Sequence, residues 1–200
     1  MFTGIIEEVG VVKEIKSEGT NKDFCIESKI SSELKVDQSI SHNGVCLTVT
    51  FIGENYHWVT AINETLVKSN LGGLITDSVV NLERCMPSNG RFDGHVVQGH
   101  VDQTAKVTAI FEENGSWLYD FEFEPNGEIV VEKGSICING VSLTCFNATE
   151  RSFRVAIIPY TYEHTTFSDL KVGDKVNLEF DVIGKYIAKY FDIYARNFPQ

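Results

Sequence analysis

Short runs of β-branched and aromatic residues, separated by Gly, Asn and Asp, fill the first 85 residues of the chain. Apolar and polar positions partly alternate within these runs, which is typical of strands that bury one face. Six such runs are VGVVKEI, DFCIES, SISHNG, VCLTVTFI, HWVTAI and SVVNLE. Six short strands favour a small closed β-barrel, because closure removes the exposed strand edges of an open sheet. ETLVKSNLG, after the fifth run, predicts a short helix.

The same pattern occurs again in the second half of the chain. SISHNGVCLTVT, from Ser39, and SICINGVSLTCF, from Ser135, match at seven of twelve positions, where chance gives about one. At the same offset NLE recurs at 81–83 and 177–179. YTYEHTTFSD is the counterpart of the predicted helix in the first half. The chain is therefore predicted to be an internal duplication of one barrel.

The extent of the repeat divides the chain. We expect an N-terminal barrel over residues 1–87 and a C-terminal barrel over 90–182, joined at the turn sequence PSNG. The segment 183–200 changes to helical spacing, with an apolar and aromatic stripe of Ile183, Ile187, Tyr190, Phe191 and Tyr194. Such a helix packs either on its own barrel or against copies of itself, and we favour an oligomerisation helix. The predicted fold class is all-β: two tandem six-stranded closed β-barrels plus a C-terminal α-helix.

Composition narrows the function. A net charge of −11, with 17 scattered basic residues, argues against binding a nucleic-acid backbone. No apolar run approaches the length of a membrane span, and MFTGIIEEVG lacks the basic region of a signal peptide. The five cysteines form no CxxC pair, which indicates reduced thiols. We therefore expect a cytoplasmic protein that binds a small molecule.

A duplication can enlarge a fold, build one pocket between two halves, or make two similar pockets for two copies of one ligand. The third explanation predicts that matched positions keep polar groups. Thr48 with Thr144, Thr65 with Thr161 and Asn43 with Asn139 do so. Other matched pairs differ: Cys46 with Ser142, His42 with Ile138, and Ile5 with His100. The pattern favours two related pockets with unequal roles.

Five segments together carry a family resemblance: MFTGII, NGVCLTVT, NGRFDGHVVQGHVD, KGSICINGVSLT and VNLEFDVIGKY. In order and over almost the full length, they resemble riboflavin synthase of the α-chain type, a family of lumazine-binding tandem barrels. The resemblance implies a homotrimer assembled by the C-terminal helix. It also implies an active site between the N-terminal barrel of one subunit and the C-terminal barrel of its neighbour. The resemblance also raises lumazine synthase as a partner with which the chain could associate.

The resemblance implies a transferase reaction, the last step of riboflavin biosynthesis. Two molecules of 6,7-dimethyl-8-ribityllumazine undergo dismutation by four-carbon transfer, which gives riboflavin and 5-amino-6-(D-ribitylamino)uracil. No cofactor and no metal are expected. Because both reactants are the same compound, two related barrels can each hold one and stack the rings. Which barrel holds the donor and which the acceptor stays open.

Four residues are the predicted catalytic set: His100, Cys46, Ser39 and Asp181. His100 suits proton handling, because histidine is the most common general acid or base in enzymes; the alternative is a structural histidine. For the other three the alternatives are a core thiol, a surface turn and a helix N-cap. His95 is expected to support the site or lie at an interface, because no cysteine or carboxylate at ligand spacing completes a metal site.

The predicted substrate-binding residues share a place on the repeated motifs, the N-terminus or the segments after the fifth strand of each half. They are Phe2, Gly4, Ile5, Ile6, Leu47, Thr48, Thr60, Ala61, Ile62, Asn63, Glu64, Thr65, Gly99, Val101, Lys133, Ser142, Leu143, Thr144, Ile158, Pro159, Tyr160, Thr161, Tyr162 and Glu163. For each threonine the alternative is simple β-propensity, and for Lys133 it is an exposed charge.

Two departures and one rival qualify the resemblance. Family members often have Asp at position 139 and Gly at position 93, where this chain has Asn139 and Asp93; Asn139 is therefore given no catalytic role. The alternative function is a non-catalytic lumazine or flavin-binding photoprotein of the same fold. Such proteins typically lack the cysteine of NGVCLT and the histidine of QGHVD, and this chain has both, as Cys46 and His100.

Overall fold

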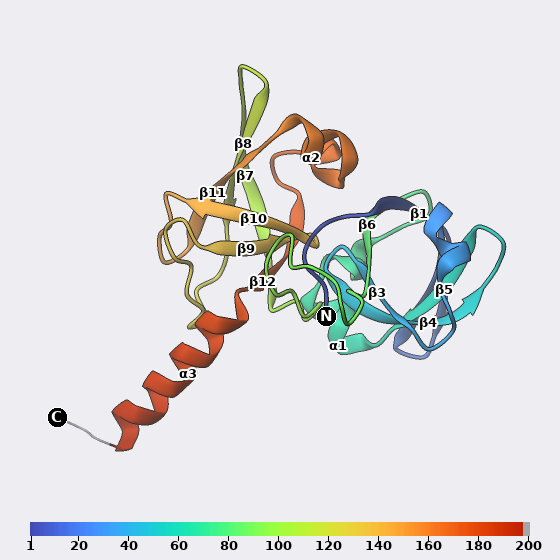
Figure 1. The fold of residues 1–200 in the computed structure, drawn as a ribbon, viewed down its shortest axis with the longest axis horizontal. Helices are drawn as coiled ribbons and strands as arrows, with labels where there is room; N and C mark the ends of the chain where they lie inside the picture. The colour runs from blue at the N-terminus through green and yellow to red at the C-terminus, as the bar shows by residue number, and fades with distance from the viewer. Residues whose placement is uncertain (198–200) are drawn as a thin grey trace.

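Two closed six-stranded antiparallel barrels follow one another along the chain in the computed structural model, which describes residues 1–197 (Figure 1). The N-terminal barrel has the strand order β1-β2-β5-β4-β3-β6. Its strands are β1 (Glu8–Glu18), β2 (Asn21–Glu27), β3 (Ser39–His42), β4 (Val45–Ile52), β5 (Tyr56–Ala61) and β6 (Val79–Arg84). The C-terminal barrel repeats the same cyclic order. Its strands are β7 (Gln103–Glu113), β8 (Ser116–Glu122), β9 (Ser135–Ile138), β10 (Val141–Phe146), β11 (Ser152–Ile157) and β12 (Lys175–Phe180). The predicted fold class is confirmed.

The short helices also repeat. In the first half α1 (Asn63–Lys68) is followed by a 3₁₀ turn at Asn70–Gly73, and in the second half α2 (Pro159–His164) is followed by one at Thr166–Asp169. A third 3₁₀ turn, Lys29–Glu33, lies between β2 and β3. In both halves the helix and its turn connect the fifth and sixth strands, as the sequence predicts.

Strand alternation decides which side chains fill each barrel and which face outward. Along β4, Val45, Leu47 and Val49 are buried in the N-terminal core. Cys46 and Thr48 point to the opposite face, because neighbouring residues of a strand alternate. The C-terminal core is more aromatic, with Tyr119, Phe121, Phe153 and Phe167 fully buried. Burying each such side chain stabilises the fold by roughly 1.5–3 kcal/mol.

The two barrels meet at the repeated Asn-Gly turns. The Asn81 side chain donates to the carbonyl of Asn139 at 2.9 Å, and the Asn177 side chain donates to the carbonyl of Asn43 at 2.8 Å. The Asn43 and Asn139 amide oxygens in turn accept the Asn81 and Asn177 main-chain N–H groups. The turns touch so closely that a Cβ on Gly44 would lie 2.8 Å from the Gly140 nitrogen. Asn43 and Asn139, the matched amides of the repeat, thus help to join the two barrels.

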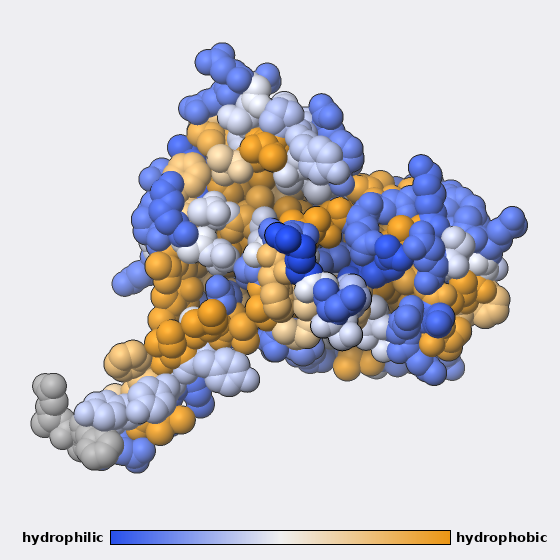
Figure 2. Space-filling view, viewed as in Figure 1, coloured by the Kyte–Doolittle hydropathy of each residue, from blue (hydrophilic) through white to orange (hydrophobic). Residues whose placement is uncertain are grey.

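The C-terminal helix, α3 (Val182–Asn197), extends away from both barrels (Figure 1). None of its described residues is buried, and Tyr186, Tyr190 and Phe191 are each about two thirds exposed or more. Figure 2 shows hydrophobic side chains gathered where the helix leaves the barrel. The helix does not lie on its own barrel. Residues 198–200 of the predicted helical segment lie outside the described residues. None of the described helices could cross a membrane.

A pair of histidines is buried inside the N-terminal barrel. His42 and His57 are 2% and 0% exposed, and their Nε2 atoms lie 2.9 Å apart in a hydrogen bond. His57 Nδ1 bonds the Ser31 hydroxyl at 2.8 Å. Burial lowers the pKa of His42 well below its ordinary value and lowers the pKa of His57 to about 4. In the C-terminal barrel the equivalent positions are the apolar Ile138 and Phe153, so only one barrel carries this acid-sensitive pair.

The buried pair predicts that acid weakens the N-terminal barrel selectively. A histidine whose folded pKa is lowered binds fewer protons folded than unfolded, so its contribution to stability falls as pH drops below 6.5 towards 4. We expect a loss of about 2 kcal/mol between pH 7 and pH 5 from His57. Urea unfolding followed at Trp58, with Trp117→Phe, measures it.

The double variant His42→Ile/His57→Phe copies the C-terminal barrel and serves as the control. Its unfolding free energy should depend less on pH by that amount, whereas the C-terminal barrel, followed at Trp117 with Trp58→Phe, should not respond to the substitutions. An equal pH dependence with and without the histidines would contradict this account.

Candidate active site

Each half of the chain begins with a segment that contacts the other half's barrel. The Gly4 carbonyl accepts the N–H of Ser142 at 2.8 Å, and the Gly99 carbonyl accepts the N–H of Cys46 at 2.8 Å. The two segments also pair with each other, through Phe2 N–H to the Val97 carbonyl at 2.7 Å and the reverse bond at 3.1 Å. The exchange creates two related groups of residues, one on the outer wall of each barrel.

The N-terminal half-site consists of Ser39, Cys46, Thr48, Gly99 and His100. Ser39 lies opposite Thr48 in the β3–β4 register and bonds the Cys46 thiol. Burial raises the pKa of Cys46, and the Ser39 hydroxyl partly offsets this rise. A thiol so placed stays protonated at neutral pH. The His100 side chain is exposed and is free to meet a ligand at this wall.

The C-terminal half-site consists of Gly4, Ile5, His95, Ser142 and Asp181. His95 Nδ1 bonds the Ser142 hydroxyl at 2.7 Å, and the His95 main-chain N–H donates to the Thr3 carbonyl at 3.1 Å. Burial lowers the pKa of His95, and the negative charge of Asp181 opposes that shift. Asp181 also accepts the N–H of Ile183 at 3.0 Å, so it caps the start of α3 as well. This half-site holds a neutral imidazole and hydroxyl beside a carboxylate.

His95 is the polar group of this half-site that the predicted catalytic set omits. The sequence does contain a signal for it, because the pair Gly-His occurs at 94–95 and again at 99–100. Each histidine lies at a different half-site: His95 at Ser142, and His100 after the glycine that bonds Cys46. The spacing alone could not assign them, because Ser142 is 47 residues away in the chain.

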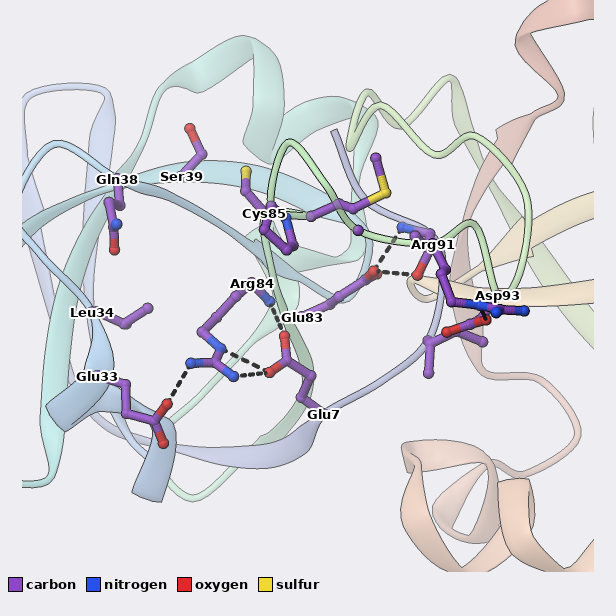
Figure 3. Close-up of a pocket in the computed structure, with 15 residues that line it drawn as sticks. Glu7, Glu33, Leu34, Gln38, Ser39, Glu83, Arg84, Cys85, Arg91 and Asp93 are labelled. Carbon is purple, nitrogen blue, oxygen red and sulfur yellow. Dashed lines mark hydrogen bonds and ion pairs between the residues drawn. The ribbon is translucent and has the colours of Figure 1, made fainter.

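A cavity of about 590 Å³ lies between the N-terminal barrel and the segments before β1 and after β6 (Figure 3). Ser39 of the N-terminal half-site and Ile5 of the C-terminal half-site both line it. Asp93, one of the two departures from the family pattern, lies at its far edge with Arg91. The volume suits a small organic molecule. Cys46 and His100 do not line this cavity, so it does not by itself unite the predicted catalytic set.

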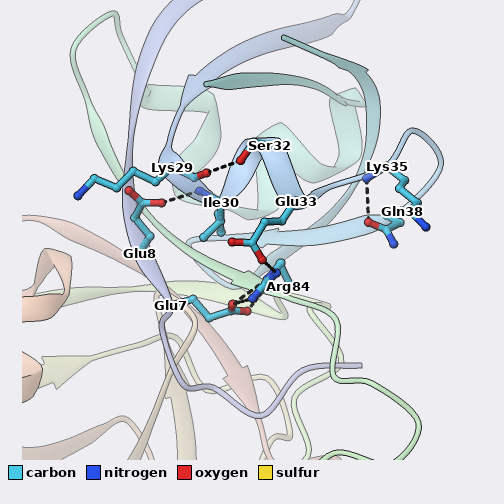
Figure 4. A network of polar contacts seen from close by, with 9 residues as sticks. All are labelled: Glu7, Glu8, Lys29, Ile30, Ser32, Glu33, Lys35, Gln38 and Arg84. Carbon is cyan, nitrogen blue, oxygen red and sulfur yellow. Dashed lines mark hydrogen bonds and ion pairs between the residues drawn. The ribbon is translucent and has the colours of Figure 1, made fainter. Parts of the chain in front are cut away.

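Arg84 lines the cavity and belongs to the network of polar contacts in Figure 4. Its guanidinium bonds Glu7 at 2.6 Å and Glu33 at 2.5 Å, which ties β6 to the segment before β1 and to the 3₁₀ turn after β2. Both carboxylates raise the pKa of Arg84. Because Arg84 pairs with both carboxylates, the three side chains form an ion-pair network along this side of the cavity.

The remaining predicted substrate-binding residues fall into two groups. Those at the barrel ends, around α1 and α2, are exposed or half-buried: Thr60, Ile62, Asn63, Glu64, Thr65, Ile158, Pro159, Tyr160, Thr161, Tyr162 and Glu163. Within this group the Thr60 hydroxyl donates to Asp23, and the Tyr162 ring stacks on Trp117 with centroids 3.8 Å apart. Thr144 is exposed on the C-terminal wall, and Lys133 lies over the Phe146 ring.

In the second group Phe2, Leu47 and Ala61 are buried, and Ile6, Val101 and Leu143 are half-buried. Its members pack in or against the apolar clusters: Phe2, Ile6, Leu47, Ala61, Val101 and Leu143. Phe2 is fully buried with Val97 and Cys137. No cluster that could hold a metal ion occurs within residues 1–197.

Two tandem barrels with paired, unequal half-sites on their outer walls define a two-barrel protein that binds small molecules. The model of the lumazine-binding domain matches twice, at residues 3–85 and 98–181. Riboflavin synthase of Bacillus subtilis (strain 168) is 44% identical over 192 residues, which cover 95% of this chain and 89% of the relative. Riboflavin synthase of Saccharomyces cerevisiae is 36% identical over 203 residues, covering 94% and 85%.

Solved structures show the same fold. The crystal structure of LumP complexed with 6,7-dimethyl-8-(1'-D-ribityl) lumazine matches with a TM-score of 0.82 at 22% identity, over 90% of this chain and 98% of that one. The chain belongs to the riboflavin synthase family of lumazine-binding proteins. It is an enzyme of the transferase class, and the alternative of a non-catalytic photoprotein is not favoured.

The N-terminal half-site predicts a slow, pH-dependent reaction of Cys46 with iodoacetamide. Because burial raises its pKa, the reactive thiolate should stay scarce until the pH passes 9. Ser39→Ala removes the bond that lowers this pKa, so alkylation at pH 8 should become slower still. Mass spectrometry of the Cys46 peptide measures the rate, and the exposed Cys85 in the same sample is the internal control. Faster alkylation of Cys46 in the Ser39 variant would contradict the assigned contact.

Proposed function

We propose that this enzyme converts two molecules of 6,7-dimethyl-8-ribityllumazine into riboflavin and 5-amino-6-(D-ribitylamino)uracil by transfer of a four-carbon unit. The observation that carries the proposal is the pair of related half-sites with unequal chemistry. Cys46 and the segment ending at His100 stand where the other half has Ser142 and the segment ending at Ile5. Two related walls can bind the same compound twice, while their different groups treat the copies differently.

The reaction needs one copy to lose a proton and the other to accept a nucleophile. One lumazine gives up a proton from its C7 methyl group and becomes a carbon nucleophile, and the other is attacked at C7. We assign the proton transfer to His100, whose imidazole is exposed and is of the type that most often serves as general acid or base in enzymes. The Cys46 thiol and Ser39 hydroxyl form the wall beside it. Holding both rings in contact supplies the proximity that a reaction of two molecules requires.

At the C-terminal half-site, we assign His95, Ser142 and Asp181 to binding the second substrate molecule. The Ser142 hydroxyl already bonds His95 at 2.7 Å, so it can relay a hydrogen bond to a ligand. Main-chain groups of the predicted binding residues around α1 and α2 suit the pyrimidine edge and the ribityl hydroxyls. No step needs a cofactor, because the atoms of two substrate molecules equal those of the two products.

Each chain presents both half-sites on its surface, and we propose that a site is completed between subunits. The N-terminal half-site of one subunit would face the C-terminal half-site of its neighbour in a homotrimer. The exposed apolar and aromatic side chains of Ile187, Tyr190 and Phe191 on α3 support the helix as the contact between copies. We further propose a cytoplasmic location, consistent with five free cysteines, and an association with lumazine synthase.

A direct assay tests the reaction. Purified protein incubated with 6,7-dimethyl-8-ribityllumazine should produce riboflavin, followed by its fluorescence, with one uracil product per riboflavin. His100→Gln should lower kcat by about 10²- to 10⁴-fold through loss of proton transfer. Its melting temperature should stay unchanged, because the side chain is exposed. Tight lumazine binding by the wild type without riboflavin formation would identify a binding protein instead.

Light scattering tests the helix. The full chain should have about three times the 22.4 kDa mass of one copy, whereas Ile187→Asp/Tyr190→Asp should leave a single copy, because the charges disrupt an apolar contact. Lys189→Ala, on the same helix, is the matched control and should keep the mass of the wild type. A large mass in the double variant would show that α3 does not hold the copies together.

A further inference from the structure

A buried carboxylate lies directly behind the N-terminal half-site. Glu179, on β12, is only 2% exposed. Its oxygens accept three consecutive main-chain N–H groups, those of Gln98, Gly99 and His100, at 2.6, 2.8 and 2.8 Å. Hydrogen bonds to an ionised carboxylate are about twice as strong as neutral ones. The carboxylate therefore fixes the main chain from which the His100 imidazole extends.

The same segment also holds Cys46. The Gly99 carbonyl accepts the Cys46 N–H at 2.8 Å, so Gly99 lies between the carboxylate and the thiol residue. Its φ of +82° and its closeness to Cys46 both require glycine, since a Cβ would lie 2.5 Å from the Cys46 Cβ. The separation of His100 and Cys46 is thus set by a group that lies in the opposite barrel.

We propose that Glu179 is a positioning residue for the reaction. Glu179 sets the distance and direction between His100 and Cys46 without touching the substrate. This role rests on the proposed function. Proton transfer is sensitive to such placement, because a displacement of about 1 Å can lower a rate 10²-fold. The active-site histidine and thiol stand on one rigid support that comes from the C-terminal barrel.

The repeat supplies an internal comparison for this role. Glu83, on β6, is the counterpart of Glu179 and accepts the Thr3 N–H at 2.7 Å, the Thr3 hydroxyl at 2.9 Å and the Gly4 N–H at 3.0 Å. The Gly4 carbonyl then accepts the Ser142 N–H. Glu83 therefore supports the C-terminal half-site as Glu179 supports the N-terminal one.

Glu179→Gln and Glu83→Gln form a matched pair of variants. Glutamine keeps the shape of the side chain but places an NH₂ group against N–H donors, so each substitution should loosen one segment. In hydrogen–deuterium exchange, Glu179→Gln should speed exchange at residues 98–100 and at Cys46. Glu83→Gln should speed exchange at residues 3–4 and at Ser142, and should leave Cys46 unchanged. These measurements do not depend on turnover.

Kinetics then separates positioning from stability. Glu179→Gln should lower kcat at least about tenfold and change KM by less than roughly threefold, with a shifted kcat–pH profile. The melting temperature should fall by only a few degrees, roughly the effect of 1 kcal/mol. If this variant does not fold, Glu179→Asp, which keeps the charge but shortens the side chain, carries the same measurements.

Unchanged exchange at 98–100, or a kcat loss that follows only the folded fraction, would overturn the inference. Failure of the proposed function is distinguishable, because the wild type itself would then make no riboflavin whatever the exchange data show.

Discussion

The joint between the two Asn-Gly turns is the contact on which the rest of the structure depends. Asn81 and Asn177 each donate to the turn of the opposite barrel, and the glycines leave no room for a side chain between the turns. These amides are buried, so a lost partner would leave an unsatisfied group that costs about 1–3 kcal/mol. The two barrels make the same contacts with each other in both directions. In this arrangement the first segment of each half reaches the barrel of the other half.

The two halves share the same main-chain contacts but differ in the side chains of their half-sites. Glu83 and Glu179 anchor equivalent segments, and Gly4 and Gly99 bond equivalent strands. The two halves differ at the residue after each glycine, which is Ile5 in one and His100 in the other. They differ also on the strand that each glycine bonds, where one has the Cys46 thiol and the other the Ser142 hydroxyl. At these two walls the repeat keeps the glutamates and glycines that hold the main chain and varies the side chains beside them. A reaction between two identical molecules requires this combination.

Much of this could be predicted from local patterns. Strand alternation and the Gly and Asn turns place the six strands of the first half, since both signals act between near neighbours, and the repeat predicts the six of the second half. Alternation also argues against Leu47 as a ligand contact, because Cys46 and Thr48 face outward on either side of it. The pairing of His95 with Ser142, and the use of Asn139 in the joint, depend on packing between residues far apart in the chain, which no local pattern encodes.

The crossing of the first segment of each half has a consequence for how far the two walls can differ. Residue for residue, each half gives a segment to its counterpart and receives one in return, and Phe2 and Val97 bond each other across the axis. Such reciprocal contacts are those of a two-fold dimer with exchanged arms. In a dimer of identical half-length chains both walls would have to be identical. Because one chain contains both halves, one wall can have the Cys46 thiol where the other has the Ser142 hydroxyl.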